Sequence, residues 1–444
     1  MGRTIALAVA LVACGRLGFD PIEGSAVDGS VVLSSASGTT LEAGSATDVT
    51  ATIEPPGAAT PGAVIDVTTS AGRLLGPDGS GETVSLAIAS DGSLPTIRLE
   101  TFLDMSDGAT LALTTSAAST SGDTEFTIAA PTTTAVDVDG VDYDVASGFD
   151  IASPGLSPPD RAILQGNSGR LAFPSSASAF ADGLYIGIRG TPPQIYRLDG
   201  ASLSLFSTSP GDPDENVAQM LFADPASAIG DVLLVCSASP GGGDGMFTVD
   251  SGGTWASWRD FNNCNGLALD PGLSAGDPGF ADPVYLNINS MQVARVTPDG
   301  LALTSLVDTL LFGASGIKLY VHDGSESFAG GLYMVYPGTN PPDADGFIWH
   351  VPDTTASWPA MPDVVIEPVG GPNAAAFGAS GGPRYGDLLF SAVAINGEIR
   401  ALRPDGTSFT LVGGLLGQTD MVLRGDELWI YEPDRGQILT VTPR

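Results

Sequence analysis

Apolar and polar residues in the last two-thirds of the chain follow a repeating unit. In each copy a turn containing Asp or Gly leads into an apolar strand, and a second strand with alternating apolar and polar residues follows. The six apolar strands carry, at equivalent positions, Tyr185, Leu233, Tyr285, Tyr333, Leu389 and Trp429. A period of roughly 40–50 residues with about four strands per unit is typical of β-propeller blades. We therefore expect a six-bladed β-propeller over residues 132–444.

Residues 30–131 show a different pattern, in which short strands alternate apolar and polar residues without a long repeat. The seven expected strands are Val31–Ser35, Ala46–Glu54, Ala63–Ser70, Glu82–Ala89, Pro95–Leu103, Ala109–Thr115 and Thr124–Ala129. Seven such strands in about 100 residues indicate a β-sandwich. The run from Pro61 to Gly72 also resembles the middle of bacterial Ig-like domains of the invasin type. The predicted fold is therefore all-β, an Ig-like sandwich followed by a propeller, and we expect the sandwich to act as a stalk or, alternatively, in adhesion.

The junction between the two units alternates apolar residues with aspartate from Ala135 to Val145. Several carboxylates close together suit a calcium site, although the residue spacing and the final glutamate of an EF-hand are absent. The alternative is a strand or hairpin with one solvent-exposed face. The sixth repeat ends at Arg444 after its third strand. Because an unpaired sheet edge is prone to opening and aggregation, we expect a strand from about 134–145 to supply the outer strand of the last blade.

Composition supports an all-β protein and excludes one class of partner. The chain has 58 Gly, 33 Pro and only 15% charged residues, which fits many turns between short strands. Acidic residues outnumber basic ones 51 to 17, for a formal charge of −34. Such a surface repels phosphate backbones and argues against nucleic acid. The acidic residues serve either to solvate Asp-rich turns or to bind cations. We expect the protein to be a monomer.

The first residues have the features of an export signal. Arg3 precedes an apolar run, Thr4–Ala13, that is too short to span a bilayer. The run ends in Leu11-Val12-Ala13-Cys14, which resembles the lipobox of bacterial lipoproteins. The resemblance implies that residues 1–13 are removed, that Cys14 carries diacylglycerol and palmitate, and that residues 14–29 form a tether. Gly15 in place of aspartate favours the outer membrane. An ordinary signal peptide with a chance cysteine is the alternative.

One turn motif supports the propeller prediction. The run from Thr248 to Trp255 resembles the Asp-box of sialidase-type propellers, in which the box joins the third and fourth strands of a blade. The resemblance implies that Asp250 accepts hydrogen bonds from backbone amides, that Gly252 and Thr254 complete the turn, and that Trp255 packs between blades. The box indicates a fold and not sialidase activity, since no arginine cluster with a Tyr/Glu pair accompanies it.

A second motif raises the possibility of a metal. Asn265-Gly266-Leu267 is similar to a strand start in gluconolactonase and regucalcin-like propellers, where the asparagine ligates a divalent cation. Asn373 and Asp420 hold comparable positions before other inner strands, and such oxygen ligands suit calcium. The glutamate that this family also needs is not found in the sequence. Strand-entry turns that favour Asn and Asp are the alternative explanation.

Two cysteines remain once Cys14 is set aside. In an oxidising cell envelope the pair Cys236 and Cys264 predicts a disulfide between the second and third blades, with two buried thiols as the alternative.

The function expected from these features is binding. We expect a cell-envelope lipoprotein, attached to the membrane through its N-terminal lipid, whose propeller binds a protein or carbohydrate ligand without catalysis. The alternative is a calcium-dependent lactonase or related hydrolase with its metal at the channel mouth.

Overall fold

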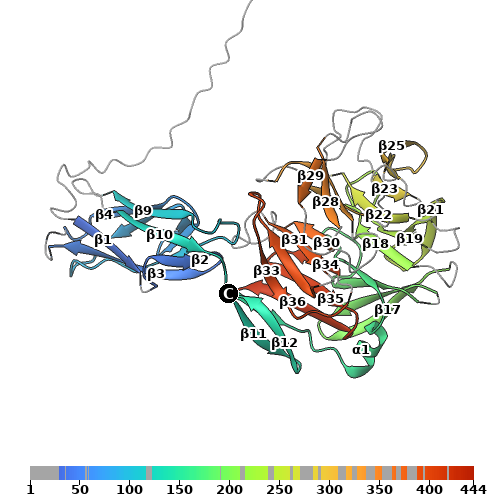
Figure 1. Ribbon diagram of the computed structural model, residues 1–444, viewed down its shortest axis with the longest axis horizontal. Coiled ribbons are helices and arrows are strands. Elements are labelled where there is room, and N and C mark those ends of the chain that lie inside the picture. The colour runs from blue at the N-terminus through green and yellow to red at the C-terminus, as the bar shows by residue number, and fades with distance from the viewer. Residues whose placement is uncertain are drawn as a thin grey trace, which may run out of the picture.

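The structure, a computed structural model, consists of a β-sandwich and a β-propeller that lie side by side (Figure 1). It describes residues 30–444 except for 36, 56–57, 59, 117–122, 191, 211–215, 239–244, 261–263, 271–283, 289–291, 309–316, 323–327, 337–345, 353–362, 367–371, 378–387, 394–395 and 418–419. The predicted all-β fold class is confirmed, and one short helix is the exception in the described part.

The sandwich consists of two five-stranded sheets, in the orders β1-β3-β8-β5-β6 and β2-β10-β9-β4-β7. The core forms because apolar and polar residues alternate along the strands. On β3, for example, Val49 and Ala51 are buried, whereas Thr50 and Thr52 are exposed. All seven expected strands are present, and three strands of only three or four residues were not predicted. The strands are β1 (Ser30–Ser35), β2 (Thr40–Glu42), β3 (Ala46–Glu54), β4 (Val64–Thr69), β5 (Arg73–Gly76), β6 (Gly79–Gly81), β7 (Thr83–Ala87), β8 (Ile97–Glu100), β9 (Thr110–Ser116) and β10 (Asp123–Ala129).

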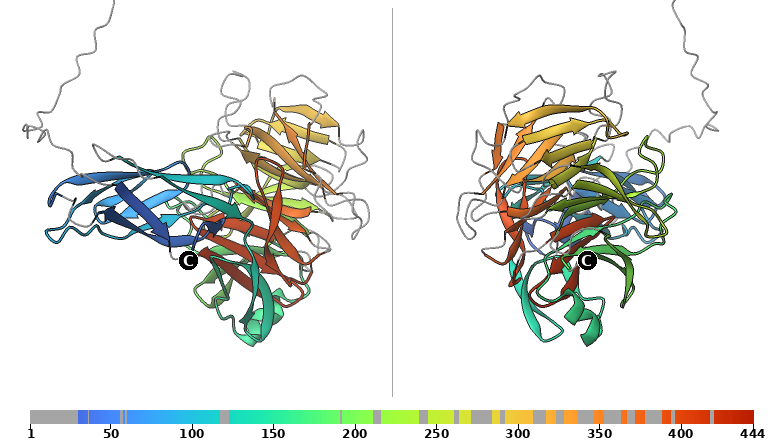
Figure 2. Two further views of the ribbon diagram at one scale, coloured as in Figure 1. Left: turned by 60° about the vertical axis from the view of Figure 1, so that its left-hand side comes forward. Right: turned by 90° about the vertical axis from the view of Figure 1, so that its right-hand side faces the viewer.

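The propeller consists of six sheets arranged in a closed ring (Figure 2). The inner strands contact one another in the order β14, β18, β22, β26, β30 and β34, and β34 contacts β14 again. The first four blades are β14 (Gly169–Ala172), β15 (Leu184–Ile188), β16 (Gln194–Asp199) and β17 (Ser202–Thr208); β18 (Asn216–Phe222), β19 (Leu233–Ala238), β20 (Gly245–Val249) and β21 (Trp255–Asp260); β22 (Cys264–Leu269), β23 (Val284–Ile288), β24 (Gln292–Val296) and β25 (Leu303–Asp308); and β26 (Lys318–His322), β27 (Gly331–Tyr336), β28 (Phe347–Val351) and β29 (Asp363–Ile366).

The fifth and sixth blades complete the ring. Their strands are β30 (Pro372–Phe377), β31 (Leu389–Val393), β32 (Glu398–Leu402) and β33 (Ser408–Gly413), and β34 (Asp420–Arg424), β35 (Glu427–Glu432) and β36 (Gln437–Pro443). The six repeat positions predicted to be equivalent all lie on the second strand of their blade: Tyr185, Leu233, Tyr285, Tyr333, Leu389 and Trp429. The sixfold repeat is therefore the blade.

The prediction that residues 134–145 form the outer strand of the last blade is wrong. These residues form a hairpin, β11 (Thr133–Val138) and β12 (Val141–Ala146), whose second strand extends the fifth blade by pairing with β33. Asp139 and Gly140 form its two-residue turn with φ of 56° and 81°, and such a turn sends the chain straight back along itself. The outer strand of the last blade is the next one, β13 (Phe149–Ala152), which pairs antiparallel with β36.

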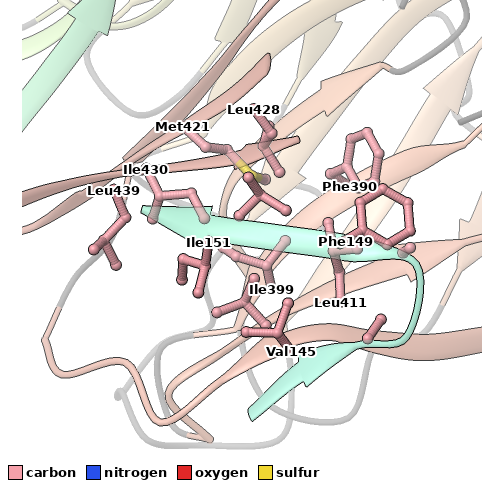
Figure 3. Close-up of a cluster of buried hydrophobic side chains, with 14 of the residues drawn as sticks. Val145, Phe149, Ile151, Phe390, Ile399, Leu411, Met421, Leu428, Ile430 and Leu439 are labelled. Carbon is pink, nitrogen blue, oxygen red and sulfur yellow. The ribbon is translucent and has the colours of Figure 1, made fainter. Parts of the chain in front are cut away.

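Apolar packing holds this closure together. Val145 of β12 and Phe149 and Ile151 of β13 are buried in one cluster with residues of the last two blades, including Phe390 and Leu439 (Figure 3). At about 25 cal/mol per Å² of buried apolar area, side chains of this size each stabilise the closed ring by about 1.5–3 kcal/mol.

The sandwich contacts the fifth blade and the linker. Arg403 Nε donates to the carbonyl oxygen of Leu103 at 3.0 Å, and Leu103 is fully buried against the propeller cluster. Glu42 of β2 accepts hydrogen bonds from Thr132, at 2.9 Å, and from Ser147.

The helix α1 (Pro158–Leu164) links β13 to the first blade and was not predicted. Ser157 caps its N-terminus, prolines occupy the first turn, and Asp160 lies near the positive end of the helix. Tyr431 Oη donates to the carbonyl oxygen of Leu164 at 2.7 Å, which fixes the helix against the last blade.

Candidate functional site

The inner strands enclose a cavity of about 440 Å³ in the propeller channel. Its walls come from β14, β18, β22, β26 and β34 and consist of Arg170, Leu171, Ala172, Phe173, Gln219, Met220, Leu221, Phe222, Leu267, Ala268, Leu269, Leu319, Tyr320, Val321, Asp420, Met421, Val422 and Leu423. The fifth inner strand, β30, has side chains outside the described residues.

Gln219 links three inner strands at the polar end of this cavity. Its Nε2 donates to the carbonyl oxygen of Leu319 at 2.8 Å. Its Oε1 accepts from the amides of Leu267, at 3.0 Å, and Leu319, at 3.2 Å. Because both ends of the side chain are satisfied while buried, Gln219 fixes the spacing of the strands around the axis.

Three charged side chains lie at the same height along the channel as Gln219, and we call this height the polar level. Lys318, the one lysine in the sequence, donates to the carbonyl oxygens of Ala218 and, at 2.9 Å, Asn265. Arg170 Nε donates to the carbonyl oxygen of Ala218 at 2.6 Å. Asp420 Oδ2 accepts from the amide of Leu171 at 2.8 Å.

Burial shifts the protonation of two of these groups in opposite directions. Burial, together with the charge of Arg170, lowers the pKa of Lys318 well below its ordinary value, while Asp420 acts in the other direction. Burial raises the pKa of Asp420, opposed by Arg170, by the Leu171 amide and by Lys318. Burial thus favours the neutral form of both side chains, while the opposite charge of each partner favours the charged form of the other.

The rest of the cavity is mainly apolar. Beyond the polar level each strand continues toward its carboxyl end with half-buried apolar or aromatic residues, among them Phe173, Leu221, Phe222, Tyr320 and Leu423. A cavity with an apolar wall and a few convergent polar groups at one end is the usual form of a small-molecule site.

The residues predicted to bind calcium are only partly brought together. Asn265 lies on β22 and Asp420 on β34, both at the polar level, whereas the side chain of Asn373 on β30 lies outside the described residues. The carbonyl oxygen of Asn265 accepts from Lys318, which also interacts electrostatically with Asp420. Among the described residues no three His, Cys, Asp or Glu side chains gather into a metal site. At this level the carbonyl oxygens of Ala218 and Asn265 accept from the ammonium group of Lys318.

Packing explains the glycine of the Asn265-Gly266-Leu267 motif. A Cβ atom at Gly266 would lie 2.3 Å from the carbonyl oxygen of Ile317, which leads into the next inner strand. Residue 266 must therefore be glycine for the third and fourth blades to approach this closely.

The Asp-box lies between the third and fourth strands of the second blade, β20 and β21. Asp250 Oδ1 accepts from the amides of Gly252, at 2.9 Å, and Thr254, at 2.8 Å. Trp255 Nε1 donates to Ser207 Oγ of the first blade at 2.8 Å. The box thus acts as a turn and as a contact between blades.

Cys236 of β19 and Cys264 of β22 form a disulfide between the second and third blades. Both cysteines are fully buried. The bond joins two blades that belong to separate sheets.

The N-terminal predictions lie outside the described residues, since Cys14 and the whole of residues 1–29 precede β1. No helix in the described part of the chain is both long and apolar enough to cross a membrane.

Sequence reasoning did not identify Arg170, Gln219 or Lys318. The available signal was the presence of single polar residues inside otherwise apolar inner strands, such as Asn-Val-Ala-Gln-Met-Leu-Phe at 216–222. Their meeting in space depends on ring closure and is not visible in any one strand.

No protein-family model matches this chain, and no curated protein matches it. Among solved structures it is similar to an auxiliary nutrient binding protein from Bacteroides thetaiotaomicron, with 12% identity over 93% of this chain and 98% of that chain and a TM-score of 0.47. A second auxiliary nutrient binding protein, from Bacteroides ovatus, gives 13% identity, 96% and 99% coverage and a TM-score of 0.47. A gluconolactonase from Xanthomonas campestris gives 11% identity, 69% and 91% coverage and a TM-score of 0.45. Similarity at this level says nothing about ligand or activity.

Proposed function

We propose that this protein is a non-enzymatic binding protein that holds a small organic ligand in the propeller channel and is presented from the cell envelope by a lipid on Cys14. The observation that carries the binding role is the cavity itself. Its volume of about 440 Å³ lies within the usual range for small-molecule sites, and Arg170 and Asp420 stand at one end of an apolar wall.

The hydrogen bonding at the polar end favours recognition over catalysis. Of the charged residues that line the cavity, Arg170 donates to the carbonyl oxygens of Ala218 and Gly169, and Asp420 accepts from a backbone amide. Groups held in this way stay in place when a ligand enters, so they fix the orientation of a polar head group at little cost in entropy. The apolar remainder of the ligand then lies against residues such as Leu221 and Phe222.

The proposed channel site is tested by finding a ligand and then placing a bulky side chain in the cavity. A thermal-shift screen of sugars, organic acids and aromatic metabolites on purified residues 15–444 identifies a ligand, and its affinity is then measured by calorimetry. Leu221 lies two residues beyond Gln219 on β18 and therefore on the same face, so Leu221→Trp places an indole in the cavity. We expect affinity to fall about tenfold or more.

The matched control is Leu205→Trp. Leu205 lies on the outer strand β17 and is 53% exposed, so the same substitution there leaves the channel unchanged. A ligand that binds Leu221→Trp and Leu205→Trp equally well, with both variants folded by circular dichroism, would exclude the channel as its site.

The membrane attachment is tested separately. We expect labelled palmitate to enter the full-length protein in a bacterial host and to be absent from Cys14→Ala, which we expect in the soluble fraction. The proposed stalk role of the sandwich depends on this attachment. Absence of label from the unaltered protein would exclude the lipid and leave the channel proposal standing.

A further inference from the structure

A second pocket, of about 330 Å³, lies between the last blade and the first. We call it the blade-junction pocket. The side chains that define its chemistry are Phe173, Asp182, Arg197, Asp199, Arg424 and Trp429. They come from the β14–β15 connection and β16 on the first blade and from β34 and β35 on the last, so the pocket exists only because the ring closes there.

The charges in this pocket are balanced in pairs. Arg424 donates to Asp182 Oδ1 at 2.6 Å, and Arg197 donates to Asp199 Oδ2 at 2.7 Å. The two carboxylates are 75% and 68% exposed, and ion pairs as exposed as these add little to folding stability. Two guanidinium forks and two carboxylates therefore present donors and acceptors to solvent with no net charge.

One nitrogen atom of the Arg197 side chain is buried without a hydrogen-bond partner. Its Nε is buried and has no hydrogen-bond partner, although its Nη2 is engaged by Asp199. A buried N–H without a partner is unfavourable by about 1–3 kcal/mol, so this guanidinium group is not fully satisfied by the protein.

Two aromatic rings form the apolar part of the pocket. Phe173 and Trp429 meet edge to face, with ring centroids 5.4 Å apart, and Arg424 lies over the Phe173 ring at 4.7 Å. Both rings are half-buried, so each keeps a part exposed toward the pocket. This packing restricts the rotation of Trp429 and leaves a rigid apolar surface beside the ion pairs.

We propose that the blade-junction pocket binds a neutral sugar ring. A pyranose offers C–H groups on one face and hydroxyl groups around its edge, which match an indole surface flanked by paired guanidinium and carboxylate groups. The balanced charge of the pocket and the net charge of −34 on the whole protein disfavour a polyanion such as a polyuronate. Phe173 also lines the channel cavity, so an oligosaccharide bound here ends next to the channel mouth.

The test uses affinity electrophoresis and calorimetry of residues 15–444 with maltohexaose, cellohexaose, xylohexaose, mannohexaose and laminarihexaose, and with an oligogalacturonate as the anionic probe. We expect at least one neutral hexasaccharide to bind, with Trp429→Ala weakening it about tenfold or more and Trp429→Phe, which keeps an aromatic surface, weakening it much less. We expect Arg424→Ala to weaken binding also.

Arg444→Ala is the matched control, since Arg444 forms a similarly exposed ion pair with Asp150, at 2.8 Å, outside the pocket. The inference is overturned if none of the neutral probes binds more tightly than about 1 mM, if the oligogalacturonate binds best, or if Trp429→Ala and Arg424→Ala bind as well as Arg444→Ala. Leu221→Trp separates the two sites: sugar binding that survives it and is weakened by Trp429→Ala belongs to the blade-junction pocket, whatever the outcome for the channel.

Discussion

Replacing Tyr143 with phenylalanine removes one hydroxyl from the closure of the ring. Tyr143 lies on β12 and is fully buried, and its hydroxyl donates to Glu432 Oε2 at 2.6 Å. Since that hydroxyl has a single hydrogen, the amide nitrogen of Gln437 donates to its oxygen, also at 2.6 Å. The other carboxylate oxygen of Glu432 accepts from Arg435 and from the amide of Leu416, the latter at 2.6 Å.

The expected loss of stability follows from the charge on Glu432. A hydrogen bond to a charged group contributes about 1.5–3 kcal/mol, and Glu432 is fully buried, so water does not replace the lost donor. We therefore expect Tyr143→Phe to lower the free energy of unfolding of the propeller by about 2 kcal/mol. The hairpin β11–β12 and β36 should both exchange amide hydrogens faster, because Tyr143 joins the two.

Tyr196→Phe is the matched control. Its hydroxyl donates to the neutral amide oxygen of Gln194 at 2.8 Å, so we expect a loss of no more than about 1 kcal/mol. Both variants are compared with the unaltered protein by urea unfolding followed by near-ultraviolet circular dichroism, with hydrogen exchange read over β12 and β36. A change in Tyr143→Phe below about 0.5 kcal/mol, or one no larger than that of Tyr196→Phe, would refute the assignment of Tyr143 as a closing contact.

Three further predictions concern stability. Replacing both Cys236 and Cys264 with alanine opens a loop with a sequence separation of 28, and the chain-entropy relation gives a loss of about 3.5 kcal/mol, measured by urea unfolding; a loss below about 1 kcal/mol would contradict it. Asp250→Ala removes the acceptor of two backbone amides and should cost about 1–2 kcal/mol by the same assay, whereas no change would mean that the turn holds without its aspartate. Burial raises the pKa of Tyr143 and Tyr431 above the ordinary value of 10.0, so their contribution to stability is present below pH 10.0 and is lost as pH rises above it. Ultraviolet titration should therefore show fewer than the nine tyrosines ionising while the sheet signal persists, and ionisation of all nine in the folded state would refute this.

Local patterns were enough to predict most strands but not which strands pair across the ring. The alternation of Val49 and Ala51 with threonines defines β3 without reference to the rest of the chain. The closing strand is different, because its partner lies nearly three hundred residues away, as the pairing of Ile151 with Val441 shows. The Asp139-Gly140 pair is a local signal for a hairpin turn, and a hairpin here leaves the next strand, β13, to close the ring.

The site was harder to predict than the fold for the same reason. Asn265 and Asp420 were identified as polar positions before inner strands, and both lie at the polar level of the channel. Their surroundings depend on Lys318, which reaches the carbonyl oxygens of Ala218 and Asn265 from another blade. Sequence alone gives the residue type at each position but not which charged side chains meet at the axis.

The way the ring closes also bears on when the protein can finish folding. Strand β13 precedes every other strand of its sheet, and its partner β36 is translated after all other strands of the ring. The earlier blades can form as they emerge, but β13 has nothing to pair with until then. The blade-junction pocket and the channel cavity are each lined by residues of both the first blade and the last, so neither can form until the strands of the last blade have been made.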